Sequence, residues 1–560
     1  MENQVWGIIM AKKWKYIIPG IIAGVLGLGG VAAYLYLKVI PAQQGTSTLA
    51  IAKIVPDEAW MTASINLDFE AWQKLEQFGT SEAQKLYKEG LDTLIKELDQ
   101  ELAEDNLSYS KDFKPWLGNA MMAFLPEEKS GGTPEFLVVI GIKDKLAALD
   151  FYNKVKKEDS LNIQETKQYK GVEIVKIGAE KSDNPGYVAI LENHLAASDQ
   201  VTTVKKAIDA SQGAPSLGTT GVSAKAFQSL ELENSVAQFH ILDYAEIIDQ
   251  LDILDEADAP EIPPELEERF KQVKSVSVGM GIDDQGIRFR SVTQFDPKLW
   301  KGQFDPIPGK IISRFPANTL LSANGGNIKK QWPLYVDHFS NIPEFASAID
   351  AIRIYVRQTT RLDLDRDIIS WMDGEVGFAL IPSKEGILEP VGFGGALVFD
   401  TSDRKKATAT FAKLDTFAKQ NNIKISNSKI GDVKVTHWQV PPLGQNVIGR
   451  GWLDDNTMFV TVGQPIAQVM ANRPKKTLDK SDIFQSVTQS LPQDSGYFYV
   501  NMEEVNQLLF SYPDVANNSE FNTPEVKAIL NSIRGIGMAN AQTDSSTLTS
   551  EFLLALKSKK

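Results

Sequence analysis

Residues 17–37 constrain this chain more than any other stretch, because they contain no charged residue. As a helix rising about 1.5 Å per residue, the stretch is about 31 Å long, which is enough to cross a hydrocarbon core of about 30 Å. A soluble domain cannot easily bury such a run on all sides. We therefore predict a transmembrane helix over residues 17–37, with the lipid bilayer as its partner.

The basic residues beside this stretch predict its orientation. Lys12, Lys13 and Lys15 precede it, whereas Lys38 alone follows it closely. Lysine and arginine are retained on the cytoplasmic side of a membrane. We expect a cytoplasmic N-terminus over residues 1–16 and a periplasmic or thylakoid-lumenal location for the bulk of the chain.

A cleaved signal peptide is the competing interpretation, since small residues at 31–33 suit a cleavage site. Cleavage there would leave the apolar residues 34–37 at the new terminus, and the apolar run is longer than a usual signal core. The sequence favours an uncleaved anchor.

Charge and cysteine content exclude several classes of function. The formal net charge of −14 disfavours nucleic acid as a partner, because phosphate backbones repel an acidic protein. The chain has no cysteine, so it forms no disulfide and no thiolate metal site. Its four histidines are scattered singly, which does not indicate a metal cage; they are His194, His240, His338 and His437. No catalytic residue, metal or cofactor is predicted.

The chain repeats itself at a spacing of about 260 residues. Matching positions occur in the same order and within the same kind of expected element; they are Pro56 and Pro316, Phe151 and Phe411, Gly171 and Gly431, Asp284 and Asp544. We predict an internal duplication with α+β fold class, in which each half has an antiparallel sheet and helices packed on one face. The expected divisions are an N-terminus at 1–16, a membrane span at 17–37, a tether at 38–52, repeat domains at 53–296 and 312–560, and a linker at 297–311.

Several local patterns set the expected elements. Ser81 and Gln84 have the spacing of a capping box at the start of a long helix. Alternating apolar residues predict strands, including one over 186–197 and a final hairpin over 273–295. The stretch 249–268 is rich in acidic residues and proline, which is typical of a solvated loop.

The best candidate for a binding surface is a helix expected over residues 343–361. Arg353, Arg357 and Arg361 fall four apart on one side of it. Three arginines on an acidic protein suit a carboxylate, a phosphate head group or an acidic partner, such as another membrane protein. The competing interpretation is a solvated face on which Asp350 pairs with Arg353 or Arg357.

A second pattern, an alternation of aspartates over residues 363–367, partly resembles a calcium-binding loop. Asp363, Asp365 and Asp367 alternate as at the start of a calcium loop. Ile368 stands where the loop needs glycine, and Gly374 stands where it needs glutamate. We therefore expect a charged turn rather than a metal site.

The chain also resembles a known family. The single N-terminal span, the segment IVPDEAWMTASINLDFEAWQKLEQFGTSEAQKL, the strand KPWLGNAMMAFLP and the later echoes FPANTLL and SWMDGEVGFALIP are similar to a cyanobacterial membrane-anchored family catalogued as domain of unknown function 3352. The resemblance covers nearly everything from Leu49 onward. It implies a cyanobacterial plasma or thylakoid membrane and assigns no catalytic residue.

Three classes of function follow. The leading hypothesis is a non-enzymatic, membrane-anchored binding or assembly protein with a scaffold role. The second is a carrier of lipid or pigment with an apolar pocket under each helix-covered sheet. The third is a hydrolase that uses carboxylates alone, which requires paired Asp or Glu in a cleft. Sequence does not reveal the oligomeric state.

The orientation can be tested in spheroplasts of a bacterial host. Protease added from outside is expected to digest the chain beyond Lys38 and to leave an epitope tag ahead of Lys12 intact, because the span places them on opposite sides. Lysed spheroplasts serve as the control in which both parts are digested. A chain that stays whole until lysis contradicts the orientation.

Overall fold

The computed structural model describes residues 47–67, 70–103, 106–126, 134–157, 163–178, 185–242, 272–298, 306–340, 343–441, 444–493, 496–516 and 522–559. The expected span 17–37 lies outside these residues, as do Lys12, Lys13, Lys15 and Lys38. Residues 243–271, which include the whole acidic stretch 249–268, likewise lie outside the described residues. Within the described parts of the chain, no helix is both long and apolar enough to cross a membrane.

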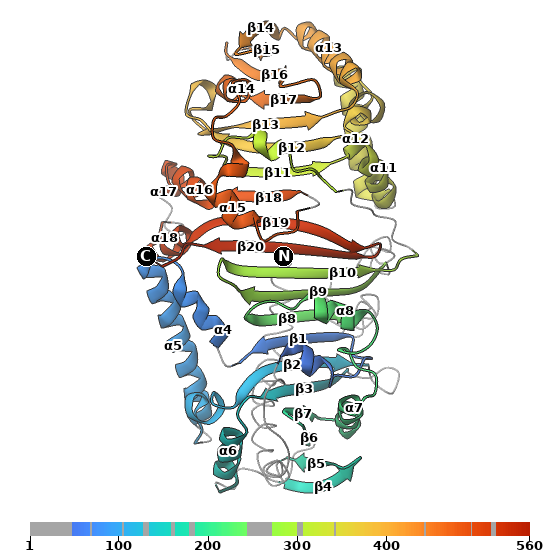
Figure 1. Ribbon diagram of the computed structural model, residues 1–560, viewed down its shortest axis with the longest axis vertical. Coiled ribbons are helices and arrows are strands. Elements are labelled where there is room, and N and C mark those ends of the chain that lie inside the picture. Colours follow the sequence, from blue (N-terminus) through green and yellow to red (C-terminus); the bar gives the residue numbers. More distant parts are fainter. Residues whose placement is uncertain are drawn as a thin grey trace.

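A single antiparallel sheet of 20 strands runs the length of the molecule, from β14 at one end to β4 at the other (Figure 1). The first ten strands are β1 Met61–Asn66, β2 Leu117–Leu125, β3 Glu135–Ile142, β4 Ile163–Tyr169, β5 Val172–Ile177, β6 Gly186–Leu191, β7 His194–Ser198, β8 Ser235–Leu242, β9 Val273–Ile282 and β10 Gly286–Phe295. The second ten are β11 Leu321–Gly326, β12 Glu375–Pro382, β13 Phe393–Asp400, β14 Lys424–Ile430, β15 Val433–Gln439, β16 Asn446–Trp452, β17 Thr457–Val462, β18 Tyr497–Asn501, β19 Ile533–Asp544 and β20 Thr547–Leu556. The predicted α+β class is confirmed.

The two halves of the sheet have the same strand order. In the first half the order is β4, β5, β6, β7, β3, β2, β1, β8, β9, β10. The second half follows the same order with each number raised by ten, from β14 to β20. The last strands, β10 and β20, pair with each other. The two sheets expected from the sequence are thus one continuous sheet, because each half ends on an edge strand that the other half covers.

Helices lie against both faces of this sheet, whereas the sequence predicted them on one. Those of the first half are α3 Thr48–Ala52, α4 Glu70–Gln73, η1 Lys74–Gln77, α5 Ser81–Ala103, η2 Tyr109–Phe113, α6 Lys145–Lys157, α7 Val201–Ser211 and α8 Gly221–Ser229. Those of the second half are η3 Ile311–Arg314, α11 Ile328–Phe339, α12 Pro343–Thr360, η4 Leu364–Ile368, η5 Ile369–Trp371, η6 Gly386–Leu388, α13 Arg404–Gln420, α14 Gln464–Ala471, η7 Leu478–Lys480, α15 Asp482–Thr488, α16 Met502–Leu509, α17 Pro513–Ala516 and α18 Pro524–Ser532.

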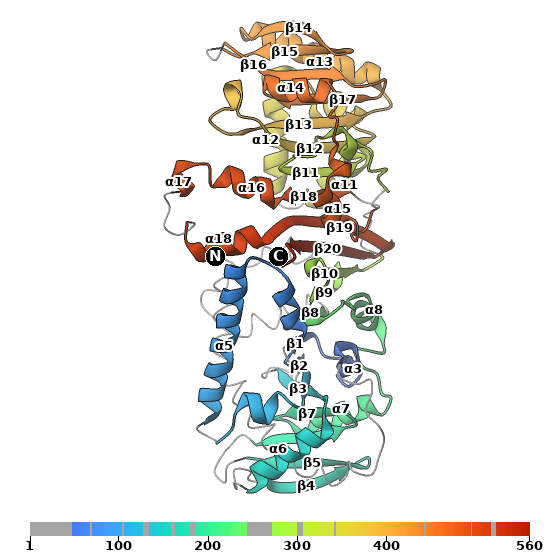
Figure 2. The ribbon, with the colours of Figure 1, turned by 60° about the vertical axis from the view of Figure 1, so that its left-hand side comes forward.

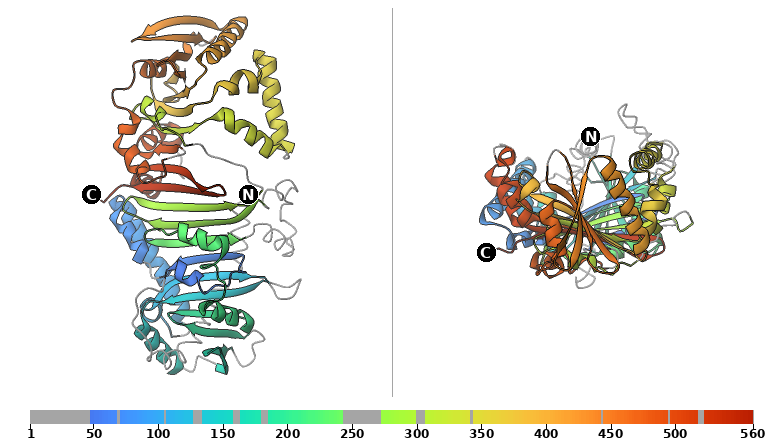
Figure 3. Two further views of the ribbon diagram at one scale, coloured as in Figure 1. Left: turned by 45° about the vertical axis from the view of Figure 1, so that its right-hand side comes forward. Right: turned by 90° about the horizontal axis from the view of Figure 1, so that it is seen from above.

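The reason for two helical layers lies in strands that are apolar on both faces. Met121 of β2 packs in a core with Ile51 of α3 and Val204 of α7. Its neighbour Ala120 points the other way and packs in a core with Leu102 of α5. Figure 2 shows α5 on one side of the first half and α3, α7 and α8 on the other. Seen from above, the strands fan out about the long axis as the sheet twists (Figure 3).

Both halves also contain the same tryptophan clasp beside the outer strands. In the second half, Trp371 Nε1 donates to the Asp367 carbonyl oxygen at 3.1 Å, and Lys413 Nζ lies 3.3 Å from the Asp367 carboxylate. The Phe411 ring lies 6.1 Å from the Trp371 ring. The first-half counterparts make the same contacts at 2.7, 2.7 and 5.5 Å; they are Trp116, Asp112, Lys154 and Phe151.

Some expected boundaries shift. The N-terminal cap of α5 is Thr80 rather than Ser81, since Thr80 Oγ1 accepts from the Ala83 amide at 3.2 Å. Gln84 makes no capping box; its side chain donates to the Phe78 carbonyl oxygen at 3.0 Å. The strand predicted over 186–197 is two strands, β6 and β7, separated by a turn at Glu192, whose φ is 54°. His194, expected in this turn, is the first residue of β7.

The expected tether at 38–52 contains the short helix α3, with Ile51 and Ala52 buried. Asp283, rather than Asp284, is the counterpart of Asp544. Asp283 accepts the amide of residue 285, and Asp544 likewise accepts the amide of residue 546, both at 2.8 Å.

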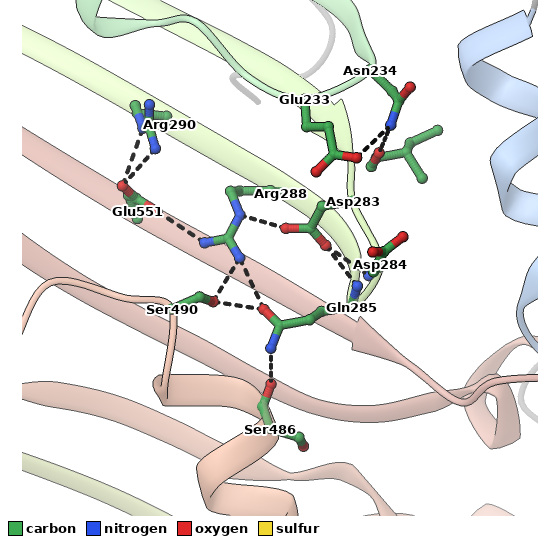
Figure 4. Close-up of polar contacts among 12 residues, drawn as sticks. Glu233, Asn234, Asp283, Asp284, Gln285, Arg288, Arg290, Ser486, Ser490 and Glu551 are labelled. Atoms are coloured by element: carbon green, nitrogen blue, oxygen red, sulfur yellow. Dashed lines mark hydrogen bonds and ion pairs between the residues drawn. The ribbon is translucent and has the colours of Figure 1, made fainter.

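The seam between β10 and β20 carries buried charge (Figure 4). Arg288 is 7% exposed and donates to Asp283 at 2.7 Å and to Glu551 at 2.9 Å. Its remaining contacts are Gln285 Oε1 at 3.1 Å and Ser490 Oγ at 2.7 Å. This guanidinium therefore binds groups of both halves.

Arg290 stands directly opposite Glu551 in the register and donates to it at 3.1 Å. Nη1 of Arg290 donates to the carbonyl oxygens of Ser229 and Glu231 at the end of α8, each at 3.1 Å. Glu551 is 7% exposed and neutralises two arginines at once. Because the carboxylate is buried, its loss leaves the arginines incompletely compensated.

Replacing this carboxylate tests the seam. Glu551→Gln is expected to lower the free energy of unfolding by about 3 kcal/mol, since it removes the shared partner of two desolvated cations. Chemical denaturation of both proteins measures the difference. The matched control is Glu503→Gln, whose exposed partner Lys557 lies 3.6 Å away, and it should cost less than about 1 kcal/mol. Equal effects of the two substitutions would contradict the role given to Glu551.

Candidate functional site

The two faces of the central strands differ in chemistry. The face with Arg288 and Glu551, here called the Arg288 face, packs against α8 and α15 through Arg290 and Ser490. The opposite face, here called the Phe289 face, carries large apolar side chains at directly opposed positions of successive strands. We call this line the apolar row; it comprises Ile65, Ala237, Met280, Phe289, Phe552, Met538, Phe498, Ala323, Phe378, Leu397 and Val460.

Several members of the apolar row are open to solvent. Phe498 is 40% exposed, Leu397 39%, Ile65 38% and Met538 37%. The rings of Phe289 and Phe552 meet edge to face across the seam with centroids 5.8 Å apart. Exposed apolar side chains aligned on one face of a sheet mark a candidate site of interaction.

The apolar row has an apolar neighbour on one side and a polar one on the other. The neighbouring row toward the β9–β10 turn is also apolar and comprises Ile282, Ile287, Leu554, Ile536, Val500, Leu321 and Leu380. On the other side, the strands at the seam carry Ser291, Ser550 and Asn540. The two rows form a strip two side chains wide with a polar border at the seam, and its β9 end, at Met280 and Ile282, packs in a core with Ala71 and Phe78.

A polar pocket of about 470 Å³ is the second candidate. It lies at the ends of β12, β13 and β17 and is lined by Lys310, Ile311, Arg314, Asp373, Gly374, Asp400, Thr401, Ser402, Asp454, Asn456 and Thr457. Arg314 lies 2.6 Å from Asp454, and Thr457 Oγ1 donates to Asp400 at 2.6 Å. Burial would raise the pKa of Asp373, but hydrogen bonds from Ser402 hold that pKa below its usual value.

The pocket's carboxylates already accept hydrogen bonds from donors of the protein: Ser402 donates to Asp373, and Thr457 donates to Asp400 and Asp454. Among the described residues, no group of three His, Asp or Glu side chains is placed to hold a metal ion. This arrangement gives the carboxylate-only hydrolase no supporting geometry at the pocket.

The predicted arginines of α12 are bound to the predicted calcium-like aspartates. Arg353 makes a two-point contact with Asp365, at 2.8 and 3.2 Å, and a longer one with Asp350 at 3.4 Å. Arg357 donates to Asp363 at 2.7 Å. The competing interpretation, a solvated face, predicted that Asp350 pairs with Arg353 or Arg357, and the contact with Arg353 is present. The stronger pairing with the aspartates that follow the helix was missed, because it depends on a fold-back through η4.

Arg361 stands apart from this pairing at the end of α12, in the left-handed region with φ 58°. Asp367 accepts the Asp363 amide at 2.8 Å and belongs to the tryptophan clasp. Trp332 Nε1 donates to Asp365 at 2.5 Å. Each of the three aspartates therefore accepts hydrogen bonds from protein donors, as expected of a charged turn.

Two of the described histidines, His240 and His437, contact serine hydroxyls. His240 is fully buried between Ser277 Oγ at 2.6 Å and Ser223 Oγ at 2.9 Å. His437 Nε2 lies 2.7 Å from Ser428 Oγ. His194 is 5% exposed, and the side chain of His338 lies outside the described part of the chain.

Sequence reasoning missed the apolar row although a signal was present. In β9 and β19, large apolar residues alternate with glycine or serine, as in Val278, Gly279, Met280, Gly281. The small residues face the helices, because a Cβ on Gly537 of β19 would lie 2.4 Å from Val487 of α15. Close helix packing requires the small residues on the Arg288 face, and this leaves the large ones on the opposite face.

Comparison with known proteins identifies a family whose description assigns no activity. A family model described as "Protein of unknown function (DUF3352)" matches residues 20–556. No curated protein matches the sequence. Among solved structures, crystal form IV of TP0453 is 11% identical with a TM-score of 0.24, and the match covers 43% of this chain and 79% of that one. For crystal form III the values are 12%, 0.25, 45% and 82%. TM-scores this low carry no argument.

The burial of His240 predicts a pH dependence. Burial lowers the pKa of His240 to about 4, so between pH 4 and about 6.5 the unfolded chain binds a proton that the folded chain does not. The free energy of unfolding should therefore fall by about 1 to 3 kcal/mol as the pH drops through this window. In His240→Gln this part of the decrease should be absent. Denaturation of both proteins at pH 4.5 and 7 measures it, and parallel curves would contradict it.

Proposed function

The chain belongs to the DUF3352 family, whose description assigns no function, and we propose that it is a non-enzymatic, membrane-anchored binding protein that takes up an apolar ligand. The observation that carries this proposal is the apolar row, a line of apolar side chains across the sheet in which Ile65, Leu397, Phe498 and Met538 are 37–40% exposed. Its chemistry suits a ligand that buries hydrocarbon surface and forms no hydrogen bonds.

The proposed location rests on the sequence. An uncleaved anchor over residues 17–37, with Lys12, Lys13 and Lys15 inside and Lys38 outside, places the described body in the periplasm or a lumen. The family resemblance implies a cyanobacterial plasma or thylakoid membrane. The shared strand order and the shared tryptophan clasp support an origin of the two halves by duplication.

The expected carrier had a pocket beneath the helix-covered face. Helices cover parts of both faces, and filled cores lie beneath them, such as the one around Ile208 and Leu137 on the Arg288 face and the one around Leu102 and Ala120 on the Phe289 face. The exposed apolar surface lies on the part of the Phe289 face that carries Phe498 and Met538. The carrier hypothesis therefore keeps its ligand class but takes a different site.

A protein partner is the second candidate, and α12 favours it. Ile354 is 54% exposed and Tyr355 68% on this helix, beside Arg357 and Arg361. An apolar patch with arginines suits a membrane-protein partner with acidic residues. Loss of crosslinking in native membranes after Arg353, Arg357 and Arg361 are changed to Gln would support this assembly role.

The proposed function predicts binding of an apolar dye. A chain beginning at residue 39 should bind 8-anilinonaphthalene-1-sulfonate with a rise in fluorescence, and Phe498→Gln with Met538→Gln should weaken that binding about tenfold by removing two apolar contacts. The matched control replaces Leu146 of α6 and Ile529 of α18, which are also exposed but lie away from the apolar row. Circular dichroism checks that each variant is folded. Equal affinities of all three proteins would contradict the proposal.

A further inference from the structure

The apolar row crosses both halves without interruption. It passes through eleven strands, from β1 to β17, and includes the β10–β20 seam. At about 4.8 Å between strands, the row is about 48 Å long. One leaflet of a bilayer contributes about 15 Å of hydrocarbon, so the row exceeds the length of one acyl chain about threefold.

The side chains of the row limit what binds there. They are apolar, and the backbone groups between them are already paired in the sheet. A ligand with polar groups over the strip would leave them without hydrogen bonds, which costs free energy. A hydrocarbon chain has no such groups. Met280 and Met538 add adaptable surface, which suits chains of varied length and saturation.

The chain that precedes the described body holds that body close to a source of hydrocarbon, the membrane lipids. The apolar run ends at residue 37, and the described structure begins at Ser47. Ten residues span at most about 35 Å when extended. With the anchor of the proposed function, the body starts within that distance of the lipid surface, so membrane lipids are the apolar molecules at hand.

Resting on that proposed function, we propose that the apolar row and its apolar neighbour bind the acyl chains of membrane lipids, which lie across the strands and over the seam. The polar border at Ser291 and Ser550 sets one side of the strip. The ligand class is thereby a lipid acyl chain rather than a pigment ring or a protein helix.

The test uses the full chain reconstituted in phosphatidylcholine vesicles that contain a phospholipid with a photoreactive diazirine near the end of one acyl chain. After irradiation, mass spectrometry should find lipid adducts on peptides that contain Phe289, Phe498, Met538 or Phe552. A phospholipid with the diazirine on its head group should give at least about tenfold fewer adducts there. Adducts confined to residues 17–37 would overturn the proposal.

Variants separate this proposal from the more general function. Phe498→Gln with Met538→Gln should reduce acyl adducts on the strip about tenfold, whereas Leu146→Gln with Ile529→Gln, at exposed positions on α6 and α18, should leave them unchanged. Equal adducts in the two pairs would overturn the lipid site. If the dye still binds but no acyl adduct forms on the strip, the apolar-ligand function stands and the lipid assignment fails. If both fail, neither stands.

Discussion

The fold depends on the antiparallel pairing of β10 with β20. Every other strand pairs within its own half, so this one seam converts two ten-stranded sheets into one. The seam also buries Arg288 and Glu551, each 7% exposed; Arg288 binds groups of both halves, and Glu551 binds two arginines of the other half. Buried charges of this kind tolerate few alternative partners, so they fix the register as well as the contact. A shift of one residue would reverse the faces of every side chain on β20.

The register fixed at the seam determines the candidate site. Phe289 and Phe552 meet only because Arg290 stands opposite Glu551 one position away. From there the row extends through Met280 on one side and Met538 on the other. The charged contacts on one face therefore align the apolar contacts on the other.

The sequence predicted the local elements well, because their signals are local. Alternating residues gave the hairpin of β9 and β10, and the 260-residue spacing anticipated the matched positions of Phe151 and Phe411 against their tryptophans. The apolar row was not predictable in this way. Phe498 and Met538 become neighbours only through pairing of β18 with β19, and Phe289 meets Phe552 across nearly half the chain. Likewise, the helix that carries the arginines, α12, was predicted correctly, but their main partners were not. Asp363 and Asp365 reach these arginines only after the chain folds back.

The seam also shows how two related halves make an unsymmetrical surface. Arg290 and Glu551 are counterparts and stand opposite each other, so a local two-fold axis passes between them. This axis relates Phe289 to Ser550 and Phe552 to Ser291. With identical halves, the two rows beside the axis would have the same composition. Because the halves differ, one row holds two phenylalanines and the other two serines. The same difference places a cation opposite an anion on the other face, where identical halves would oppose like charges. The sequence differences between the halves thus yield both the charge pairing that joins them and the apolar strip with a polar edge.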